Sequence, residues 1–190
     1  MLKIIYYVHG TTNDNINKLC SGWKDVALID RGIEEASSLS KKTPYQFDVL
    51  FSSDLTRAVT SAQLSWPNIN LIKDKRLREC NYGDYDGLSK ELVKYEEHID
   101  NPFPNGESLK DVETRIRDFL CFLLDNYNNK TVGIVAHRAP QLALDVIIKK
   151  QSWEEAIKND WRKIGDWQPG WVYEIGDNDY AEKIKQRRSN

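Results

Sequence analysis

The sequence predicts one α/β domain of three layers, with a mostly parallel sheet flanked by helices on both faces. Short, continuous apolar runs that are typical of buried strands alternate with stretches of helical periodicity. The 190 residues, 40% hydrophobic and 29% charged, are enough for one globular domain with a core. Because no long polar linker interrupts the pattern, we expect a single domain over residues 1–176 and a polar C-terminal tail over residues 177–190.

The expected elements follow from local pattern. Strands are predicted where short apolar runs are bounded by polar residues, at residues 3–8, 47–51, 70–72, 131–136 and 171–175. Helices are predicted at residues 31–40, 54–66, 90–99 and 140–149, and in a segment that begins after Ser108. Ser108 and Asp111 have capping-box spacing, and an apolar face follows them at helical intervals.

Composition and charge exclude several classes of function. The net charge is 27 − 29 = −2, so no strongly basic field is available to attract nucleic acid or a membrane surface. The apolar runs are too short to span a bilayer, and the N-terminus does not resemble a signal peptide. Cys20, Cys80 and Cys121 lack metal-binding spacing and are expected to be free thiols. These features predict a cytoplasmic protein and leave open whether it is a monomer or a homodimer.

Polar side chains follow four of the predicted strands at the point where each strand ends. Listed by strand, they are His9, then Ser52, Ser53 and Arg57, then Arg78 and Glu79, then His137 and Arg138. In open α/β sheets, ligands bind beyond the carboxyl ends of the strands. Since two of the three histidines in the chain lie at such positions, we expect these residues to share one site.

This set of side chains suits phosphoryl transfer. A neutral imidazole is a good nucleophile near pH 7 and can carry phosphate as a covalent intermediate. Arginine binds phosphate oxygens in a bidentate manner, a second imidazole can donate to the transferred group, and a carboxyl group can protonate the leaving oxygen. The sequence has no Walker-type loop, which disfavours nucleotide hydrolysis of that kind.

Several separate segments carry a resemblance to a known family. Residues 8–15 read Val-His-Gly-Thr-Thr-Asn-Asp-Asn, 21–25 read Ser-Gly-Trp-Lys-Asp, and 28–32 read Leu-Ile-Asp-Arg-Gly. Residues 52–58 read Ser-Ser-Asp-Leu-Thr-Arg-Ala, 77–79 read Leu-Arg-Glu, and 82–87 read Tyr-Gly-Asp-Tyr-Asp-Gly. Residues 105–108 read Asn-Gly-Glu-Ser, and 135–137 read Val-Ala-His. In these segments the chain resembles the phosphoglycerate-mutase-like branch of the histidine phosphatase superfamily, over roughly residues 1–150.

The resemblance implies a fold and a set of roles. His9 would be the phosphorylated nucleophile, and Glu79 the general acid and base. Arg57 and His137 would bind the phosphoryl group with help from Asn15. The substrate side would be formed by Thr12, Ser21 and Gly22. The resemblance implies no metal and no organic cofactor, and a small phosphorylated metabolite as the substrate.

The chain departs from the family pattern at two positions beside the histidines. Val8 stands where the family has an arginine that contacts phosphate, and a lost contact of this kind costs about 2–4 kcal/mol of transition-state stabilisation. Arg138 stands where the family usually has glycine. We hypothesise that the Arg138 guanidinium fills the space beside Val8.

Reaction type and substrate are less constrained. Mutases of the family hold their substrate with paired arginines in an added segment, and residues 88–106 contain Lys90 and Lys94 but no arginine. This difference favours hydrolysis of a phosphomonoester over mutase activity. Two alternatives remain, a catalytically weak module that binds phosphorylated ligands and a metal site formed by His9, His137 and Glu79. Trp153, Trp161, Trp167 and Trp171 lie outside the resemblance, and most are expected to be core anchors.

Overall fold

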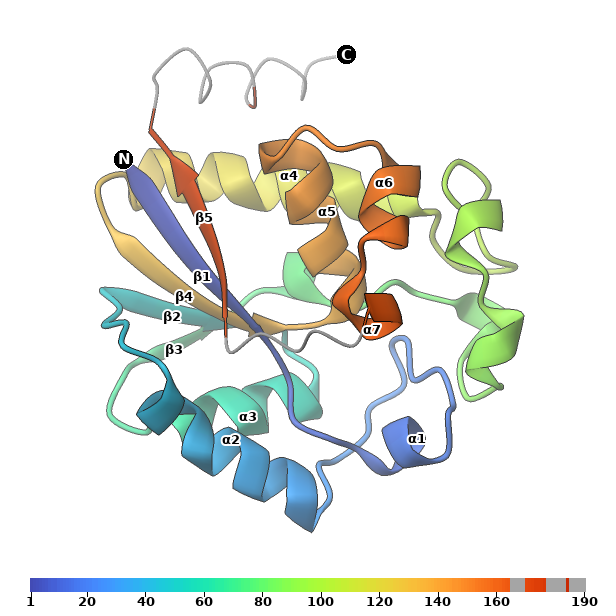
Figure 1. The fold of residues 1–190 in the computed structure, drawn as a ribbon, viewed down its shortest axis with the longest axis horizontal. Helices are drawn as coiled ribbons and strands as arrows, with labels where there is room; N and C mark the ends of the chain where they lie inside the picture. The colour runs from blue at the N-terminus through green and yellow to red at the C-terminus, as the bar shows by residue number, and fades with distance from the viewer. Residues whose placement is uncertain (165–169, 177–183, 185–190) are drawn as a thin grey trace.

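A computed structural model of the chain describes residues 1–164, 170–176 and 184. Five strands form one sheet in the order β3-β2-β4-β1-β5 (Figure 1). Their bounds are Leu2–Val8 for β1, Val49–Ser52 for β2, Leu71–Lys73 for β3, Thr131–Ala136 for β4 and Trp171–Ile175 for β5. The fourth and fifth predicted strands match these bounds, and the others are displaced by one or two residues.

The sheet is parallel except at one edge. β1 pairs with β4, β4 with β2 and β2 with β3 in parallel register, whereas β5 pairs with β1 antiparallel. The carboxyl ends of four strands therefore lie at the same edge of the sheet. Because β1, β4 and β2 are neighbours, the residues that follow Val8, Ser52 and Ala136 emerge side by side at that edge.

Helices cover both faces of this sheet, as the sequence predicts. On one face α2 (Asp30–Lys42) and α3 (Thr56–Ser65) pack on Ile5, Leu50 and Val135. On the other face lie α4 (Leu109–Asn126), α5 (Arg138–Ile148) and α6 (Trp153–Lys158), which bury the larger hydrophobic core. This alternation of buried side chains along β1 arises because successive residues of a strand point to opposite faces.

The α4 helix begins as its sequence signature predicts. The Ser108 side chain accepts a hydrogen bond from the backbone N–H of Asp111, and the Asp111 carboxylate accepts one from the N–H of Ser108. This reciprocal capping box satisfies two amides that the first helical turn leaves unpaired. The predicted apolar face is buried over the length of the helix.

The predicted helix over residues 90–99 is wrong. This segment forms two 3₁₀ turns, η3 (Lys90–Leu92) and η4 (Tyr95–Glu97), which are separated by extended backbone at Val93 and Lys94. Tyr95 is buried, and its hydroxyl bonds to that of Tyr82 over 2.6 Å. Burial of this ring overrides the helical propensity of the segment. Further 3₁₀ turns occur at η1 (Lys75–Leu77) and η2 (Gly83–Tyr85).

Two short helices that the pattern did not predict border the carboxyl edge, α1 (Asn13–Ile16) and α7 (Trp161–Ile164). Of the predicted C-terminal tail, only Ile184 is described, and this residue is buried in the larger core. Among the described residues, no helix is long and apolar enough to cross a membrane.

Candidate active site

A cavity of about 110 Å³ opens at the carboxyl edge of the sheet. Seven of the nine predicted site residues line it: His9, Asn15, Ser21, Gly22, Arg57, Glu79 and Arg138. They come from segments that are far apart in the sequence. The parallel arrangement of β1, β2 and β4 explains why they meet, since each strand delivers its following residues to the same edge.

His9 is held in one tautomer by its own neighbour. Its Nδ1 lies 2.7 Å from the carbonyl oxygen of Gly10, so Nδ1 carries the proton and donates to that oxygen. The other ring nitrogen, Nε2, then retains its lone pair. Burial, with the nearby positive charge of Arg57, lowers the pKa of His9 to about 3. The imidazole is therefore neutral at physiological pH.

His137 lies behind His9 and is completely buried. The centroids of the two imidazole rings are 5.1 Å apart. Nε2 of His137 lies 2.6 Å from Ser53 Oγ, whereas Nδ1 is buried without a hydrogen-bond partner among the described residues. Burial, and secondly the charge of Arg57, holds the pKa of His137 well below its usual value. Unlike the seven cavity residues, His137 does not form part of the cavity wall.

Arg57 lies at the bottom of the cavity with an exposed fraction of 1%. Its Nη2 donates to the Gly22 carbonyl over 2.8 Å, and its Nη1 to the Lys24 carbonyl over 3.0 Å. Gly22 has a φ of +46°, and a Cβ added there would meet Asp86 Oδ1 at 1.7 Å, so only glycine fits. The turn and the guanidinium thus fix each other.

Glu79 extends from the loop after η1 to the first turn of α5. Its Oε1 accepts hydrogen bonds from the N–H groups of Cys80 and Ala139 over 2.9 Å each. Its Oε2 accepts one from the N–H of Arg138 over 3.2 Å. The basic residues that precede it have other partners, since Arg76 pairs with Asp74 and Arg78 with Asp54. Among the described residues, neither arginine therefore forms an ion pair with Glu79.

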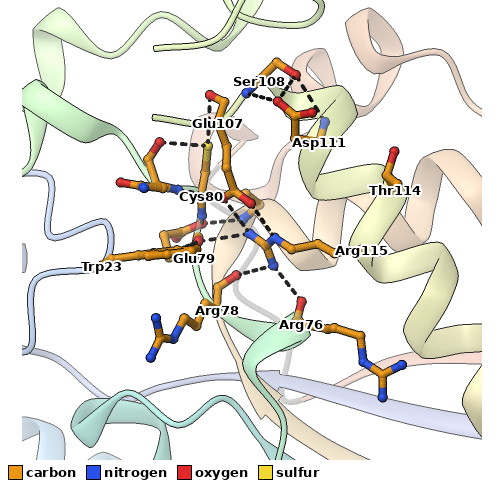
Figure 2. A network of polar contacts seen from close by, with 12 residues as sticks. Trp23, Arg76, Arg78, Glu79, Cys80, Glu107, Ser108, Asp111, Thr114 and Arg115 are labelled. Carbon is orange, nitrogen blue, oxygen red and sulfur yellow. Dashed lines mark hydrogen bonds and ion pairs between the residues drawn. The ribbon is translucent and has the colours of Figure 1, made fainter. Parts of the chain in front are cut away.

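The loop that carries Glu79 is held by a partly buried arginine that the sequence did not indicate (Figure 2). Arg115, on α4, forms two hydrogen bonds to the carboxylate of Glu107, 2.9 Å and 3.1 Å long. The same guanidinium donates to the carbonyl oxygens of Arg76, Arg78 and Glu79. The backbone N–H of Asn81 also donates to Glu107. Three successive parts of the loop are thereby fixed to one helix.

Thr12 is not brought to the cavity wall. It is fully buried, and its side chain accepts a hydrogen bond from the backbone N–H of Asn15 at the start of α1. In a second hydrogen bond, Oδ1 of Asn15 accepts from the backbone N–H of Thr12. Since Oδ1 is engaged, the Asn15 amide NH₂ is the group available to an anion in the cavity. Thr12 acts here as a cap that positions Asn15.

Arg138 lines the cavity but does not fill the space beside Val8, so the hypothesis of a replacement from this position is wrong. Its guanidinium is paired with Asp160, a fully buried carboxylate, and lies 4.2 Å from the centroid of the Tyr95 ring. Val8 instead lines a neighbouring groove of about 530 Å³, to which Arg138 does not contribute. The guanidinium is thus engaged by the buried Asp160 carboxylate and by the Tyr95 ring.

Two cationic residues outside the predicted set also line the cavity, Lys90 from η3 and Arg162 from α7. Lys90 follows the acid-bearing loop, and its charge alone does not predict a place in the cavity. Arg162 follows no strand, so the rule that indicated the other residues could not find it.

Comparison with known proteins agrees with this geometry. Residues 5–168 match the family described as Histidine phosphatase superfamily (branch 1). The chain belongs to this superfamily. It is 33% identical over 169 residues to a 2,3-bisphosphoglycerate-dependent phosphoglycerate mutase of Bartonella bacilliformis, covering 78% of this chain and 82% of that one. A mutase of Methylocella silvestris with the same name is 32% identical over 162 residues, covering 75% and 79% of the two chains.

Solved structures of other proteins share the fold. YhfR of Bacillus stearothermophilus superposes with a TM-score of 0.80 at 22% identity, over 93% of this chain and 92% of that one. A mycobacterial glucosyl-3-phosphoglycerate phosphatase, solved with VO3, gives a TM-score of 0.74 at 24% identity, over 82% and 86% of the chains. These matches confirm the three-layer α/β architecture of a histidine phosphatase domain.

The remaining predictions concern metal binding and the tryptophans. Within residues 1–164, 170–176 and 184, no group of three or more His, Cys, Asp or Glu side chains is placed to hold a metal ion. Trp153 and Trp171 are buried in the larger core, as expected for anchors. Trp161 is half-buried, with its ring 5.9 Å from that of Trp171, and Trp167 lies outside the described residues.

Proposed function

We propose that this histidine phosphatase domain hydrolyses a small phosphomonoester through a phosphohistidine on His9. The observation that carries the proposal is the state of His9. Its Nδ1–H is bound to Gly10, its pKa is lowered to about 3, and it lines a cavity together with Arg57 and Glu79. A neutral imidazole with a free Nε2 beside a buried guanidinium is arranged to attack a phosphoryl group.

In the first half-reaction, the His9 Nε2–P bond forms while the ester P–O bond breaks. Glu79 acts as the general acid and gives a proton to the departing oxygen. Arg57 compensates the charge on the transferred oxygens. When Ser53 Oγ–H donates its hydrogen bond to Nε2 of His137, the ring proton lies on Nδ1, which can then donate to the transferred group. In the second half-reaction, Glu79 takes a proton from water, the new P–O bond forms and the Nε2–P bond breaks.

Mutase activity is the second candidate, because the relatives that are 31–33% identical carry that name. Hydrolysis is favoured by the segment at residues 88–106, which contains no arginine and forms two short 3₁₀ turns. A mutase must retain its bisphosphate long enough to reorient it, which requires several fixed contacts to the substrate.

The test combines turnover with trapping of the intermediate. We expect the purified protein to release phosphate from members of a panel of phosphorylated metabolites, without inhibition by a chelator. Acid-labile, alkali-stable phosphate should be found on His9 after rapid quenching. His9→Ala should abolish both signals, whereas His98→Ala should retain them, because His98 stacks on Phe103 at 3.7 Å and does not line the cavity.

Other outcomes identify the alternatives. Binding of phosphorylated metabolites without phosphate release would identify the chain as a binding module. Conversion of 3-phosphoglycerate to 2-phosphoglycerate with 2,3-bisphosphoglycerate present, faster than phosphate release, would identify a mutase. Loss of turnover on addition of chelator would indicate a metal-dependent reaction and contradict the proposal.

A further inference from the structure

The positively charged side chains of the site lie at different depths. Arg57 is buried at the bottom of the cavity, close to His9, whereas Lys90 and Arg162 are exposed. Lys90 and Arg162 line the cavity and also the neighbouring groove, which they share with His9 and Asn15. They therefore stand at the junction of the two spaces, which forms the mouth of the active site.

Arg162 differs in its partners from the other arginines that line the cavity and the groove. Arg138 is paired with Asp160, and Arg31, which also lines the groove, is paired with Glu35. No carboxylate of the described residues lies within 4.0 Å of the Arg162 guanidinium, which stands 4.5 Å from the centroid of the Trp161 ring. Within the described part of the chain, no carboxylate thus competes for the donors of this planar guanidinium, which can bind an oxyanion in a bidentate manner.

The backbone around Arg162 is fixed by a buried residue. One oxygen of Asp160 accepts a hydrogen bond from the Arg162 N–H over 3.0 Å, while the other binds the Arg138 guanidinium. The Asp160 side chain has an exposed fraction of 0%. The first turn of α7 is thus tied to a cavity residue, and this contact directs Arg162 to the mouth.

The direction of the reaction determines what lies at this mouth. The phosphoryl group is attacked by His9 with Arg57 beside it, at the buried end. In an in-line displacement the leaving group points away from the nucleophile. The rest of the substrate therefore extends from His9 toward Lys90 and Arg162. Two exposed positive charges at that point would be well matched by a second anionic group on the substrate.

We propose that Arg162 is a specificity residue that binds a second oxyanion, a carboxylate or phosphate, on the leaving group of the substrate. The inference rests on the proposed phosphatase reaction. It assigns a substrate class to the site, namely phosphomonoesters whose alcohol portion is itself negatively charged. Lys90 adds charge at the same mouth, while Arg162 supplies the planar, bidentate donor.

The test uses two esters that share a skeleton, 3-phosphoglycerate and glycerol 3-phosphate, which carry a carboxylate and a neutral hydroxymethyl group. Arg162→Gln should lower kcat/KM for 3-phosphoglycerate by about tenfold or more, as expected for a lost charge-assisted contact. For glycerol 3-phosphate the change should be less than about twofold. Arg162→Lys should retain part of the preference in kcat/KM for 3-phosphoglycerate over glycerol 3-phosphate.

Lys163 provides the matched control. It lies on the same helix, is paired with Glu96 at 2.8 Å and lines neither the cavity nor the groove. Lys163→Gln should leave both kcat/KM values unchanged, which separates loss of the Arg162 charge from displacement of α7. An equal decrease for both esters in Arg162→Gln, or no decrease for either, would overturn the proposal.

A binding measurement keeps this inference separate from the proposed reaction. The same two esters are titrated calorimetrically into His9→Ala with and without Arg162→Gln. A tighter association of 3-phosphoglycerate that depends on Arg162 supports the inference even if the native chain shows no turnover. Equal affinities for the two esters in His9→Ala would refute it even if the native chain is an active phosphatase.

Discussion

At the scale of single residues, the state of His9 makes a direct prediction about protonation. Because burial and the charge of Arg57 lower its pKa to about 3, the ring should stay neutral, with the proton on Nδ1, from pH 8 down to about pH 5. Nitrogen-15 NMR of the imidazole, assigned by the loss of signals in His9→Ala, measures this state. Arg57→Met removes the second cause and should raise the pKa toward 6.5. Titration of the native ring near pH 6.5 would contradict the assigned state of the nucleophile.

The residues of the site differ in how far the sequence could reveal them. His9 and His137 follow apolar runs whose strand character depends on local sequence, so their convergence could be predicted from the rule for parallel sheets. The partner of Arg138 could not be predicted in this way. Asp160 is 22 positions away, and the pairing depends on the packing of the chain between them. Thr12 matched a family motif, but its hydroxyl is used by the backbone of α1.

At the scale of elements, the same distinction separates two segments that the sequence predicts as helices. The start of α4 was predictable because Ser108 and Asp111 satisfy each other's backbone locally. The segment at residues 90–99 was not, because burial of Tyr95 against Tyr82 depends on a neighbouring loop. Local pattern identifies elements whose stability is local, and it fails where a tertiary contact decides the conformation.

The position of Glu79, the proposed general acid and base, depends on the contact between α4 and the loop that carries it. Arg115→Met leaves the Glu107 carboxylate and three carbonyl groups without their donor, in a region where both side chains are mostly buried. We expect the free energy of unfolding to fall by about 3 kcal/mol. Because the loop that positions Glu79 is no longer fixed to α4, the fold-decrease in kcat should exceed the fold-change in KM. Urea unfolding and steady-state kinetics measure the two effects.

Arg117 is the matched control on the same helix. It pairs with Glu113 and is as buried as Arg115, with side-chain exposures of 12% and 14%. Arg117→Met should also lower the free energy of unfolding. It should leave kcat near the native value, because within the described part of the chain Arg117 forms no hydrogen bond to the Glu79 loop. If both variants lost kcat in parallel with stability, Arg115 would have only a general structural role.

At the scale of the whole molecule, the sheet order places the buried His137 at the centre of the carboxyl edge, and this burial links folding to pH. Its folded-state pKa lies well below 6.5, so the folded chain binds fewer protons than the unfolded chain as the pH falls below that value. The contribution of His137 to stability is therefore fully present above about pH 6.5 and is lost as the pH falls. The slope from this one residue reaches about 1.4 kcal/mol per pH unit.

Urea unfolding of the native chain and of His137→Gln between pH 7 and pH 5 isolates this contribution, because carboxylates that titrate in both chains cancel in the difference. We expect the free energy of unfolding to fall more steeply with acid in the native chain, by about 1 kcal/mol per pH unit. Ser53 can donate to the glutamine oxygen as it does to the imidazole, so the variant keeps that hydrogen bond. Equal slopes would mean that His137 is protonated in the folded protein, which would place a second positive charge beside Arg57 and raise the attraction of the empty site for phosphate.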